Sequence, residues 1–386
     1  MAGLTASPLH PPRKIGFYTA GPPFAGDCLA RGEALGGSET AFIQMTQALA
    51  RRGHQVWAFN NCPRPGLHGG VRWHNFPESL RLLARETFDI FVVSRYAGFF
   101  SLPLAAGLKV LWNHDTLDNP RELKLVHDEI DLFLVLSDFH RDNFLIRLPQ
   151  LDDRLVVTRN GLDFELMDQS AVEPPDPDLL IHASRPERGL RLLLEEIWPR
   201  LHHRHPELKL QVCGYQLKLE GLPPDLAETY RRVDSLLAAT PGVINLGSLG
   251  KQEYYRRLGQ SALMLYPSIF PEISCLAVLE AQGLGVPALT SDAFALSESV
   301  PEPELRVGGR PGTPEYIHAY VERALHLLKD RRKLARLGQA ARAAVRAHYA
   351  WDQVAAEWDR LFDLNLRAKA RPGYGLETRA EPAPVH

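Results

Sequence analysis

The chain has 386 residues, of which 45% are hydrophobic and 23% are charged, as is typical of a soluble globular protein. This length exceeds one ordinary hydrophobic core, so two domains are expected. The formal net charge of −2 gives no electrostatic reason to expect a nucleic-acid partner.

No export signal is expected in the N-terminal residues. Residues 1–12 lack the apolar run of a secretory signal and are expected to be disordered. The longest apolar window, residues 96–108, contains Pro103 and is too short to span a bilayer. These features predict a cytoplasmic protein and leave peripheral contact with the inner face of the membrane open. The cysteines form no CxxC pair and are expected to be reduced, packed thiols: Cys28, Cys62, Cys213 and Cys275.

A first domain is expected over residues 13–170. Strand-like runs alternate there with helical patterns such as residues 38–53, for which Ser38 is a good N-cap. Near-continuous apolar strands separated by helices imply a parallel sheet with helices on both faces. The strand-like runs are residues 14–20, 54–60, 88–94, 108–114, 130–137 and 154–160.

Residues 168–178 interrupt this pattern with a proline-rich and acidic stretch that is typical of a linker. The Asp-Pro-Asp sequence at 176–178 is interpreted as part of that linker and not as a metal motif. A second domain is expected over residues 171–350, with strand-like runs at 179–184, 208–214, 242–247, 262–268 and 286–291.

The last third is helical. Apolar residues recur at helical spacing from 314 to 370, with a final helix predicted at 351–368 and a disordered tail at 369–386. The predicted fold class is α/β, with two doubly wound, Rossmann-like parallel-sheet domains. Ligands bind such sheets at the carboxyl ends of the strands, so the site is expected in the cleft between the domains.

A dehydrogenase is excluded by the glycine pattern. A dinucleotide site needs G-x-G-x-x-G directly between a strand and a helix, followed by an acid about 20 residues on. Here a long loop follows the first strand, and the second strand ends in Asn60 and Asn61. The first strand of the second half is followed by "RPERG", which has one glycine.

Two short segments favour anion binding. Gly36 and Gly37 precede the first helix, where glycine lets backbone approach a ligand and free N–H groups attract an anion. A flexible turn before the helix is the alternative. Arg185 and Arg188 follow the first strand of the second half, and their guanidinium groups suit a diphosphate. The alternative is a pair of solvated charges near Glu187.

The segment from Pro267 to Ser291 carries two acids in an apolar setting. A strand ends at Ser268, a loop holds Glu272, and a helix that begins near Ser274 or Cys275 holds Glu280. A carboxylate accepts hydrogen bonds from vicinal hydroxyls, and a helix start between two acids can hold a phosphate. An acid near a helix N-terminus plus an unrelated surface glutamate is the alternative.

This segment resembles the E-x7-E signature of retaining GT-B glycosyltransferases, especially family 4. Other motifs of that family occur in the expected order: "GGSE" before the first helix, "NGLD" at 160–163, "SRPERGL" at 184–190 and "YAWDQVAAEWDRLF" near the end. The resemblance covers residues 14–368 and implies that the last helix crosses back onto the first domain. The signature residues are Pro267, Ser268, Glu272, Glu280, Ala281, Gly285 and Pro287.

The resemblance implies roles for the acids and the arginines. Glu280 would bind the ribose hydroxyls of a nucleotide-sugar donor, and Glu272 would contact the donor sugar. Arg185 and Arg188 would hold the diphosphate as it leaves. Relatives usually have lysine at the second of these positions, so Arg188 is a departure that keeps the charge and changes the geometry.

The remaining site residues follow from the same resemblance. Gly36 and Gly37 would lie near the donor phosphates, and Asn160 belongs to the "NGLD" motif that closes the first domain. His114 resembles a histidine near the reacting sugar, with a core or capping histidine as the alternative. Where relatives have Gly or Phe after the first acid, this chain has a run whose backbone N–H groups can serve: Ile273, Ser274 and Cys275.

The expected function is transfer of a hexose from a nucleotide-diphosphate sugar, UDP- or GDP-linked, to a hydroxyl of a glycan or glycolipid. The reaction is expected to retain anomeric configuration without a metal or other cofactor. The alternatives are a nucleotide-sugar epimerase, a glycoside phosphorylase and a non-catalytic sugar-nucleotide-binding protein. Residues 139–150 and 330–349 are candidates for membrane contact, with a solvated helix face as the alternative.

Overall fold

The computed structural model describes residues 11–214, 219 and 221–370. The disorder expected at 1–12 and 369–386 therefore falls mostly outside the described residues. Lys369 lies within them, and it is the last residue of a helix rather than part of a tail.

The first sheet has eight strands in the order β3-β4-β2-β1-β5-β6-β7-β8. All its neighbouring pairs are parallel except β3 and β4, which form an antiparallel edge that the sequence pattern did not predict. The strands are β1 Lys14–Thr19, β2 Gln55–Asn60, β3 Gly66–His68, β4 Val71–Asn75, β5 Phe88–Ser94, β6 Ala106–Trp112, β7 Leu132–Val135 and β8 Leu155–Val157.

Helices cover both faces of this sheet, and two separate apolar clusters fill the layers between them. The α-helices are α1 Gly37–Arg51, α2 Leu80–Leu83, α3 Arg121–Val126, α4 Asp138–Leu145 and α5 Phe164–Ser170. The 3-10 helices are η1 Ala97–Ser101, η2 His127–Glu129 and η3 Pro149–Arg154.

The second sheet is fully parallel, in the order β11-β10-β9-β12-β13-β14. Its strands are β9 Asp176–Ala183, β10 Lys209–Cys213, β11 Val243–Gly247, β12 Ser261–Tyr266, β13 Ala288–Ser291 and the unpredicted β14 Arg306–Val307. Its helices are α6 Leu190–Leu192, α7 Trp198–Arg204, α8 Pro224–Ala239, α9 Lys251–Gly259, α10 Leu276–Gly283, α11 Leu296–Ser299, α12 Pro314–Lys329 and α13 Arg331–His348, with η4 Pro186–Arg188, η5 Leu193–Ile197 and η6 Pro303–Leu305.

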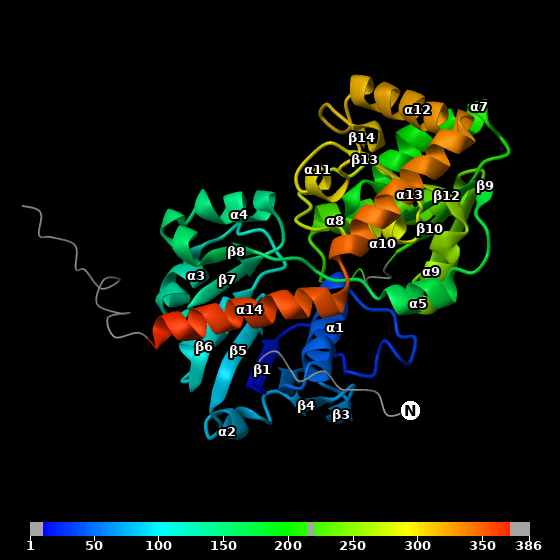
Figure 1. The fold of residues 1–386 in the computed structure, drawn as a ribbon. Helices are drawn as coiled ribbons and strands as arrows, with labels where there is room; N and C mark the ends of the chain where they lie inside the picture. The colour runs from blue at the N-terminus through cyan, green and yellow to red at the C-terminus, as the bar shows by residue number, and fades with distance from the viewer. Residues whose placement is uncertain (1–10, 215–218, 220, 371–386) are drawn as a thin grey trace, which may run out of the picture.

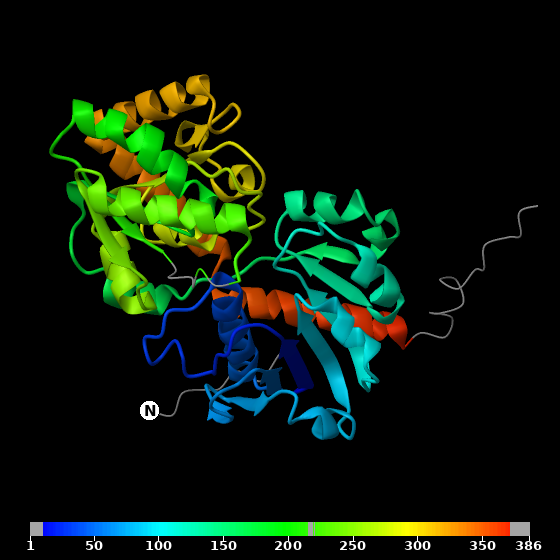
Figure 2. The ribbon, with the colours of Figure 1, turned by 180° about the vertical axis from the view of Figure 1, so that it is seen from behind.

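The last helix, α14 Trp351–Lys369, returns to the first domain, and Figure 1 shows it lying across that domain's sheet next to α1. Trp358 is buried there, stacks on Phe17 and donates from its indole N–H to Thr158 Oγ1 at 2.8 Å. The chain passes between the domains twice, and the two passages touch where the Leu162 N–H donates to the Tyr349 carbonyl at 2.6 Å. The predicted twin-sheet architecture with a helix crossing back is confirmed, and the views from both sides agree (Figure 2).

Two local predictions were wrong. The predicted linker at 168–178 is shorter, because α5 continues to Ser170 and β9 already begins at Asp176. The Asp176 N–H donates to Gln260 O at 2.8 Å, which starts the ladder with β12. Pro177 is tolerated because the other neighbour, β10, pairs only from Leu179 onward.

Ser38 is not the N-cap of the first helix. The helix begins at Gly37, and Gly36 is its N-cap, with its carbonyl accepting from the Thr40 N–H at 2.9 Å. Ser38 therefore lies in the first turn, where its hydroxyl accepts from Arg95 Nη1 at 3.4 Å.

Candidate functional site

A cavity of about 360 Å³ lies between the two domains at the carboxyl ends of their strands. Its wall contains every predicted site residue except Gly36 and Glu280. Gly36 immediately precedes the lining residue Gly37, and Glu280 lines an adjoining cavity. The predicted residues on the wall are Gly37, His114, Asn160, Arg185, Arg188, Glu272, Ile273, Ser274 and Cys275.

A hydrogen-bonded chain fixes Glu272 at the base of this cavity. Its Oε2 accepts from Arg188 Nη1 at 2.8 Å, and its Oε1 accepts from the Tyr266 hydroxyl at 2.6 Å. Burial raises the pKa of Glu272, and the Arg188 guanidinium and the Tyr266 hydroxyl oppose that rise. The carboxylate has further lone pairs, so it can still accept a hydrogen bond from a hydroxyl of a ligand.

The two arginines come from one short element. Arg185 is the N-cap of η4, and its carbonyl accepts from the Arg188 N–H at 3.0 Å. Gly189 then adopts φ +100, and a Cβ there would lie 2.2 Å from the Pro267 carbonyl oxygen. This glycine therefore lets η4 pack against the end of β12, which brings both arginines to the same cavity wall as Glu272.

Two helix starts meet at the cavity. Among the described residues, no side chain caps α10 at Cys275 or α1 at Gly36. A Cβ on Gly37 would lie 3.1 Å from Leu276 Cδ1, so the two starts are in close contact across the cleft. Uncapped helix starts favour an anion through their N–H groups and dipoles.

The Cys275 side chain is not a nucleophile candidate at neutral pH. Burial raises the pKa of this thiol to about 12. Its contribution to the site is therefore its backbone at the start of α10, as the sequence interpretation held for residues 273–275.

Glu280 lies in a smaller cavity of about 90 Å³ that shares wall residues with the first. It is 4% exposed, and its Oε1 forms an ion pair with Lys251 and accepts from the Tyr255 hydroxyl at 2.9 Å. Residues on three strand ends and on α9 complete the wall, including Ser184, Gly214, Ser248, Leu249 and Tyr254. The wall thus combines small residues such as Ser184, Gly214 and Ser248 with the acid Glu280.

His114 lines the cavity from the first domain's side. Its Nδ1 lies 3.3 Å from the Ser94 hydroxyl and its Nε2 lies 3.3 Å from Asn160 Oδ1. Because an amide oxygen can only accept, Nε2 carries the proton and Nδ1 accepts from Ser94. Burial lowers the pKa of His114 to about 3, so the ring is neutral at physiological pH.

Arg95 is a cavity residue that the sequence interpretation missed. It has φ 73, a left-handed conformation that is rare outside glycine, and it lines the cavity with a bidentate ion pair to Asp115 at 2.6 and 3.0 Å. It directly follows strand β5, so the rule that ligands bind at strand ends could have identified it. Tyr266 and Lys251 were also missed, because nothing in their local sequence marks them.

At the cavity's outer edge the domains touch again. The Glu298 carboxylate, on α11, accepts from the N–H groups of Asp138 and Phe139 at the start of α4, both at 2.8 Å. The rings of Phe139 and Phe294 lie 5.4 Å apart beside this contact. These contacts join the start of α4 in the first domain to α11 and Phe294 in the second, in addition to the two chain crossings.

Within the described part of the chain, no cluster of three or more His, Cys, Asp or Glu side chains is arranged to hold a metal ion. In the same residues, no helix is both long enough and apolar enough to cross a bilayer. The basic face of α13 is largely ion-paired: Arg331 with Asp178, Lys333 with Glu304, and Arg342 and Arg346 with Asp168.

Solved structures with this architecture span nearly the whole chain. A sucrose-phosphate synthase from Thermosynechococcus elongatus superposes with a TM-score of 0.70 at 15% identity, covering 92% of this chain and 100% of its own. Anabaena HepE in complex with UDP-glucose gives 0.67 at 16%, covering 91% and 100%. The catalytic domain of starch synthase IV from Arabidopsis thaliana, bound to ADP and acarbose, gives 0.67 at 13%, covering 92% and 100%.

The second domain carries the family assignment. Residues 163–344 match the model of the family described as "Glycosyl transferases group 1", a range that contains both arginines, both acids and helix α10. No curated protein matches the chain. Residues 163–344 therefore match the glycosyl transferases group 1 family, and the chain as a whole has the GT-B fold of the solved glycosyltransferases.

Proposed function

We propose that the chain is a glycosyltransferase that moves a sugar, expected to be a hexose, from a nucleoside diphosphate to the hydroxyl of an acceptor, with retention of configuration and without a metal. The observation that carries the proposal is the convergence of Arg185, Arg188 and the α10 start on one cavity that also holds Glu272. This arrangement places positive charge where a diphosphate would leave and a carboxylate where a sugar would sit.

The donor's parts fit the two joined cavities. Glu280 is the acid of the smaller cavity, so the ribose hydroxyls are assigned to it and the base to the small-residue slot around Gly214 and Ser248. The diphosphate then falls between Arg185 and the start of α10, and the sugar falls beside Glu272 and His114. The complexes of HepE with UDP-glucose and of starch synthase IV with ADP support a nucleoside diphosphate here.

The proposed chemistry breaks one bond and forms one. The bond between the anomeric carbon and the diphosphate oxygen breaks, and negative charge grows on the diphosphate. The arginines and the helix-start N–H groups stabilise that charge in a cavity with little water. The acceptor hydroxyl attacks from the same face and gives its proton to the departing phosphate oxygen, which retains configuration without a protein nucleophile.

Neutral His114 fits a hydrogen-bonding role. With a pKa of about 3 it holds no charge to repel the oxocarbenium-like sugar, and Asn160 and Ser94 fix its ring. A charged imidazolium at this place would oppose the positive charge that develops on the sugar. Both ring nitrogens are occupied by these partners, so a donor hydroxyl would replace Ser94 or Asn160 on the ring, and the assignment is positioning of that hydroxyl rather than proton transfer.

The acceptor is assigned only as a hydroxyl compound, a glycan or a glycolipid. Its natural place is the first domain's wall, where Arg95, Asp115 and Asp118 line the cavity. The ion pairs along α13 favour a solvated helix face over a lipid-binding face for residues 330–349. Ile146, which follows α4 and is 78% exposed, keeps residues 139–150 as the better candidate for membrane contact.

A thermal-shift panel tests the proposal. UDP, GDP, ADP and their common sugars are titrated, because a ligand that binds the folded state alone raises the melting temperature. The donor that responds is then followed for nucleotide release without acceptor. A clear shift with slow donor hydrolysis is expected. A shift without hydrolysis or transfer would favour a non-catalytic binding protein, and no shift with any nucleotide would contradict the proposal.

A further inference from the structure

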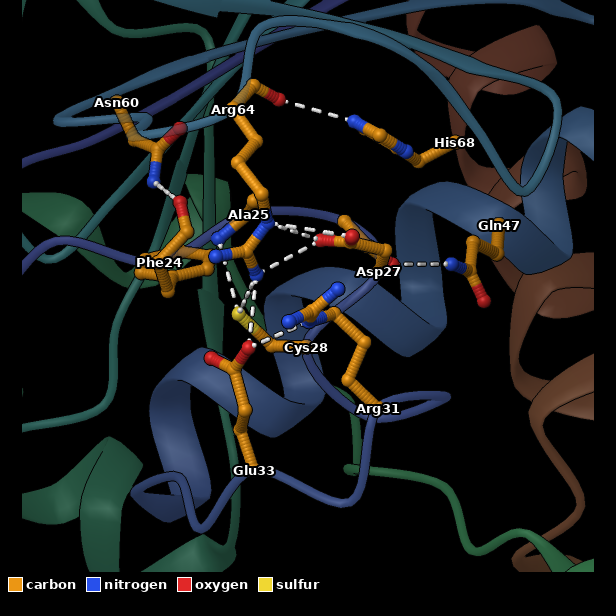
Figure 3. A network of polar contacts seen from close by, with 11 residues as sticks. Phe24, Ala25, Asp27, Cys28, Arg31, Glu33, Gln47, Asn60, Arg64 and His68 are labelled. Atoms are coloured by element: carbon orange, nitrogen blue, oxygen red, sulfur yellow. Dashed lines mark hydrogen bonds and ion pairs between the residues drawn. The ribbon is translucent and has the colours of Figure 1, made fainter.

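The segment between β1 and α1, residues 20–36, is a long irregular loop that one arginine ties together. Figure 3 shows Arg64, which follows β2, pointing into the loop with Asp27, Cys28 and Glu33 around its guanidinium. Nη2 donates to Asp27 Oδ1 at 2.9 Å, to Glu33 Oε1 at 2.9 Å and to Cys28 Sγ at 3.3 Å. Nε adds a second bond to Asp27 Oδ1 at 3.0 Å.

These contacts add side-chain bonds to a loop whose backbone already turns back on itself. The Arg31 N–H donates to the Asp27 carbonyl and the Glu33 N–H donates to the Cys28 carbonyl, both at 3.0 Å, which brings Glu33 near Asp27. A guanidinium can bridge two carboxylates in a fixed plane, which a lysine ammonium cannot do in the same geometry. Arg64 therefore ties this turn to the segment that follows β2 and limits how far residues 28–36 can move away from it.

The near half of the loop is fixed independently to the first domain. Asn60 Nδ2 donates to the Phe24 carbonyl at 2.8 Å, and Gln47 Nε2 donates to the Gly26 carbonyl at 3.0 Å (Figure 3). Gly26 packs so tightly that a Cβ there would lie 2.1 Å from Trp73 Nε1. Loss of Arg64 would thus loosen the exposed part of residues 28–36, while the base of the loop and the buried Cys28 stay in place.

The far half reaches the second domain at the nucleoside end of the cleft. A Cβ on Gly250, the N-cap of α9, would lie 2.2 Å from the Gly32 carbonyl oxygen, so the two backbones are in direct contact. The next residue, Lys251, forms the ion pair with Glu280. Leu35, at the end of the loop, lines the small cavity that holds Glu280.

We propose that Arg64 is a positioning residue for donor binding, acting through the loop on the wall of the nucleoside cavity. The assignment rests on the proposed function, because the occupant of that cavity is a nucleoside diphosphate. Arg64 touches no part of the cavity where the glycosidic bond is exchanged, so it sets affinity for the nucleotide and leaves the chemical step alone.

The test uses the full chain with Arg64→Gln, Arg64→Lys and Glu33→Gln, and with Arg141→Gln as the matched control. Arg141 forms an ion pair with Asp152 in the same domain and lines neither of the two cavities. Two measurements are made: amide hydrogen exchange without ligand, and the Kd for whichever of UDP, GDP and ADP the wild type binds. Steady-state kinetics with the corresponding nucleotide sugar separates KM from kcat.

We expect Arg64→Gln to speed exchange at residues 28–36 and in the first turn of α9, to raise the nucleotide Kd and donor KM about tenfold, and to change kcat less than twofold. Arg64→Lys should be intermediate. Glu33→Gln should raise the nucleotide Kd by a smaller factor. This variant replaces Arg64→Gln as the test if Arg64→Gln fails to fold. Arg141→Gln should match the wild type in every measurement.

Four results would overturn the assignment. Unchanged exchange at residues 28–36 would show that Arg64 does not hold the loop, whatever the protein binds. Faster exchange with an unchanged Kd, or a fall in kcat alone, would show that the loop does not set donor affinity. A wild-type chain that binds none of the three nucleotides would contradict the proposed function, and with it the donor role of Arg64, even where the exchange effect is present.

Discussion

Arg188 Nη1 and Glu272 Oε2 lie 2.8 Å apart, so the residue assigned to the diphosphate and the residue assigned to the sugar bind each other directly. Glu272 is 2% exposed, and the guanidinium also lies 4.3 Å over the Phe270 ring. A buried carboxylate is stable only with such a partner. The pair therefore links leaving-group stabilisation to sugar positioning, and a change at either residue is expected to disturb both.

Arg188→Ala should lower kcat by about 100-fold to 1000-fold, because it removes a cation from the charge that grows in the transition state. It should also cost about 3 kcal/mol of stability by leaving Glu272 buried without its cation. Steady-state kinetics and urea unfolding measure the two effects. The double variant Arg188→Ala/Glu272→Gln should recover most of the stability and none of the kcat. Recovery of both would show that Arg188 acts through folding alone.

Glu280→Gln should weaken nucleotide binding about tenfold or more, since it replaces the acceptor assigned to the ribose hydroxyls. Lys251→Met should act in the same direction, because Lys251 compensates the buried carboxylate. Titration calorimetry with the nucleoside diphosphate checks both. Glu253→Gln, on the outward part of α9 among Arg256 and Arg257, is the matched control. An unaltered nucleotide Kd in Glu280→Gln would show that Glu280 does not bind the ribose hydroxyls.

His114→Asn should lower kcat about tenfold without changing the shape of the pH profile between pH 5 and pH 8. The pKa of His114 is lowered to about 3 by burial, so the ring does not titrate in that range. Rates measured at half-unit steps in both proteins test this. An acidic limb near pH 6 in the wild type that disappears in the variant would show that His114 transfers a proton.

Glu298→Gln should favour the open arrangement of the domains, because the charge-assisted bonds to the start of α4 weaken. Glu298 is exposed, so the expected effect is about 1 kcal/mol or less. Small-angle scattering should show a larger radius of gyration for the ligand-free variant, and the donor KM should rise by up to about fivefold. Glu315→Gln, in the first turn of α12, is the control. Equal scattering curves for wild type and variant would mean that this contact does not hold the closed form.

Stability should fall as the pH is lowered from about 6.5 toward 4. Burial lowers the pKa of His114 to about 3 and the pKa values of His140 and His182 to about 4. The unfolded chain takes up these protons first, so each neutral histidine contributes stability above pH 6.5 that is lost on acidification, at up to about 1.4 kcal/mol per pH unit. Urea unfolding across this range tests the slope. His140→Gln should flatten it, and a wild-type stability independent of pH would contradict the buried neutral rings.

Much of the fold was predictable because its signals are local. Runs such as residues 88–94 are apolar throughout, as strands buried on both faces must be, and all the predicted strand regions contain strands. The β3–β4 edge was missed because both strands are short and the turn between them, at Gly69 and Gly70, is glycine-rich. Ser38 was misplaced as N-cap because its side chain bonds Arg95, which is 57 positions away, instead of the helix it enters.

The candidate site, like the fold, could be predicted only where its signals are local. The spacing of Glu272 and Glu280 is local, so the strand–loop–helix unit between them could be predicted. Their partners could not, because Arg188 is 84 positions from Glu272 and Lys251 is 29 positions from Glu280. The local sequence around Tyr266 indicates only a strand residue. Its hydrogen bond to Glu272 is visible only in the folded structure. Arg64 is typical of a loop arginine, and the contacts that give it a role all depend on tertiary packing.

A crystal structure with the nucleoside diphosphate that stabilises the chain most would test the central claim most directly. The diphosphate is predicted to lie between Arg185, Arg188 and the start of α10, with both ribose hydroxyls on Glu280. A nucleotide bound in another part of the chain, or bound in the cleft with Glu280 still paired only to Lys251 and Tyr255, would contradict it.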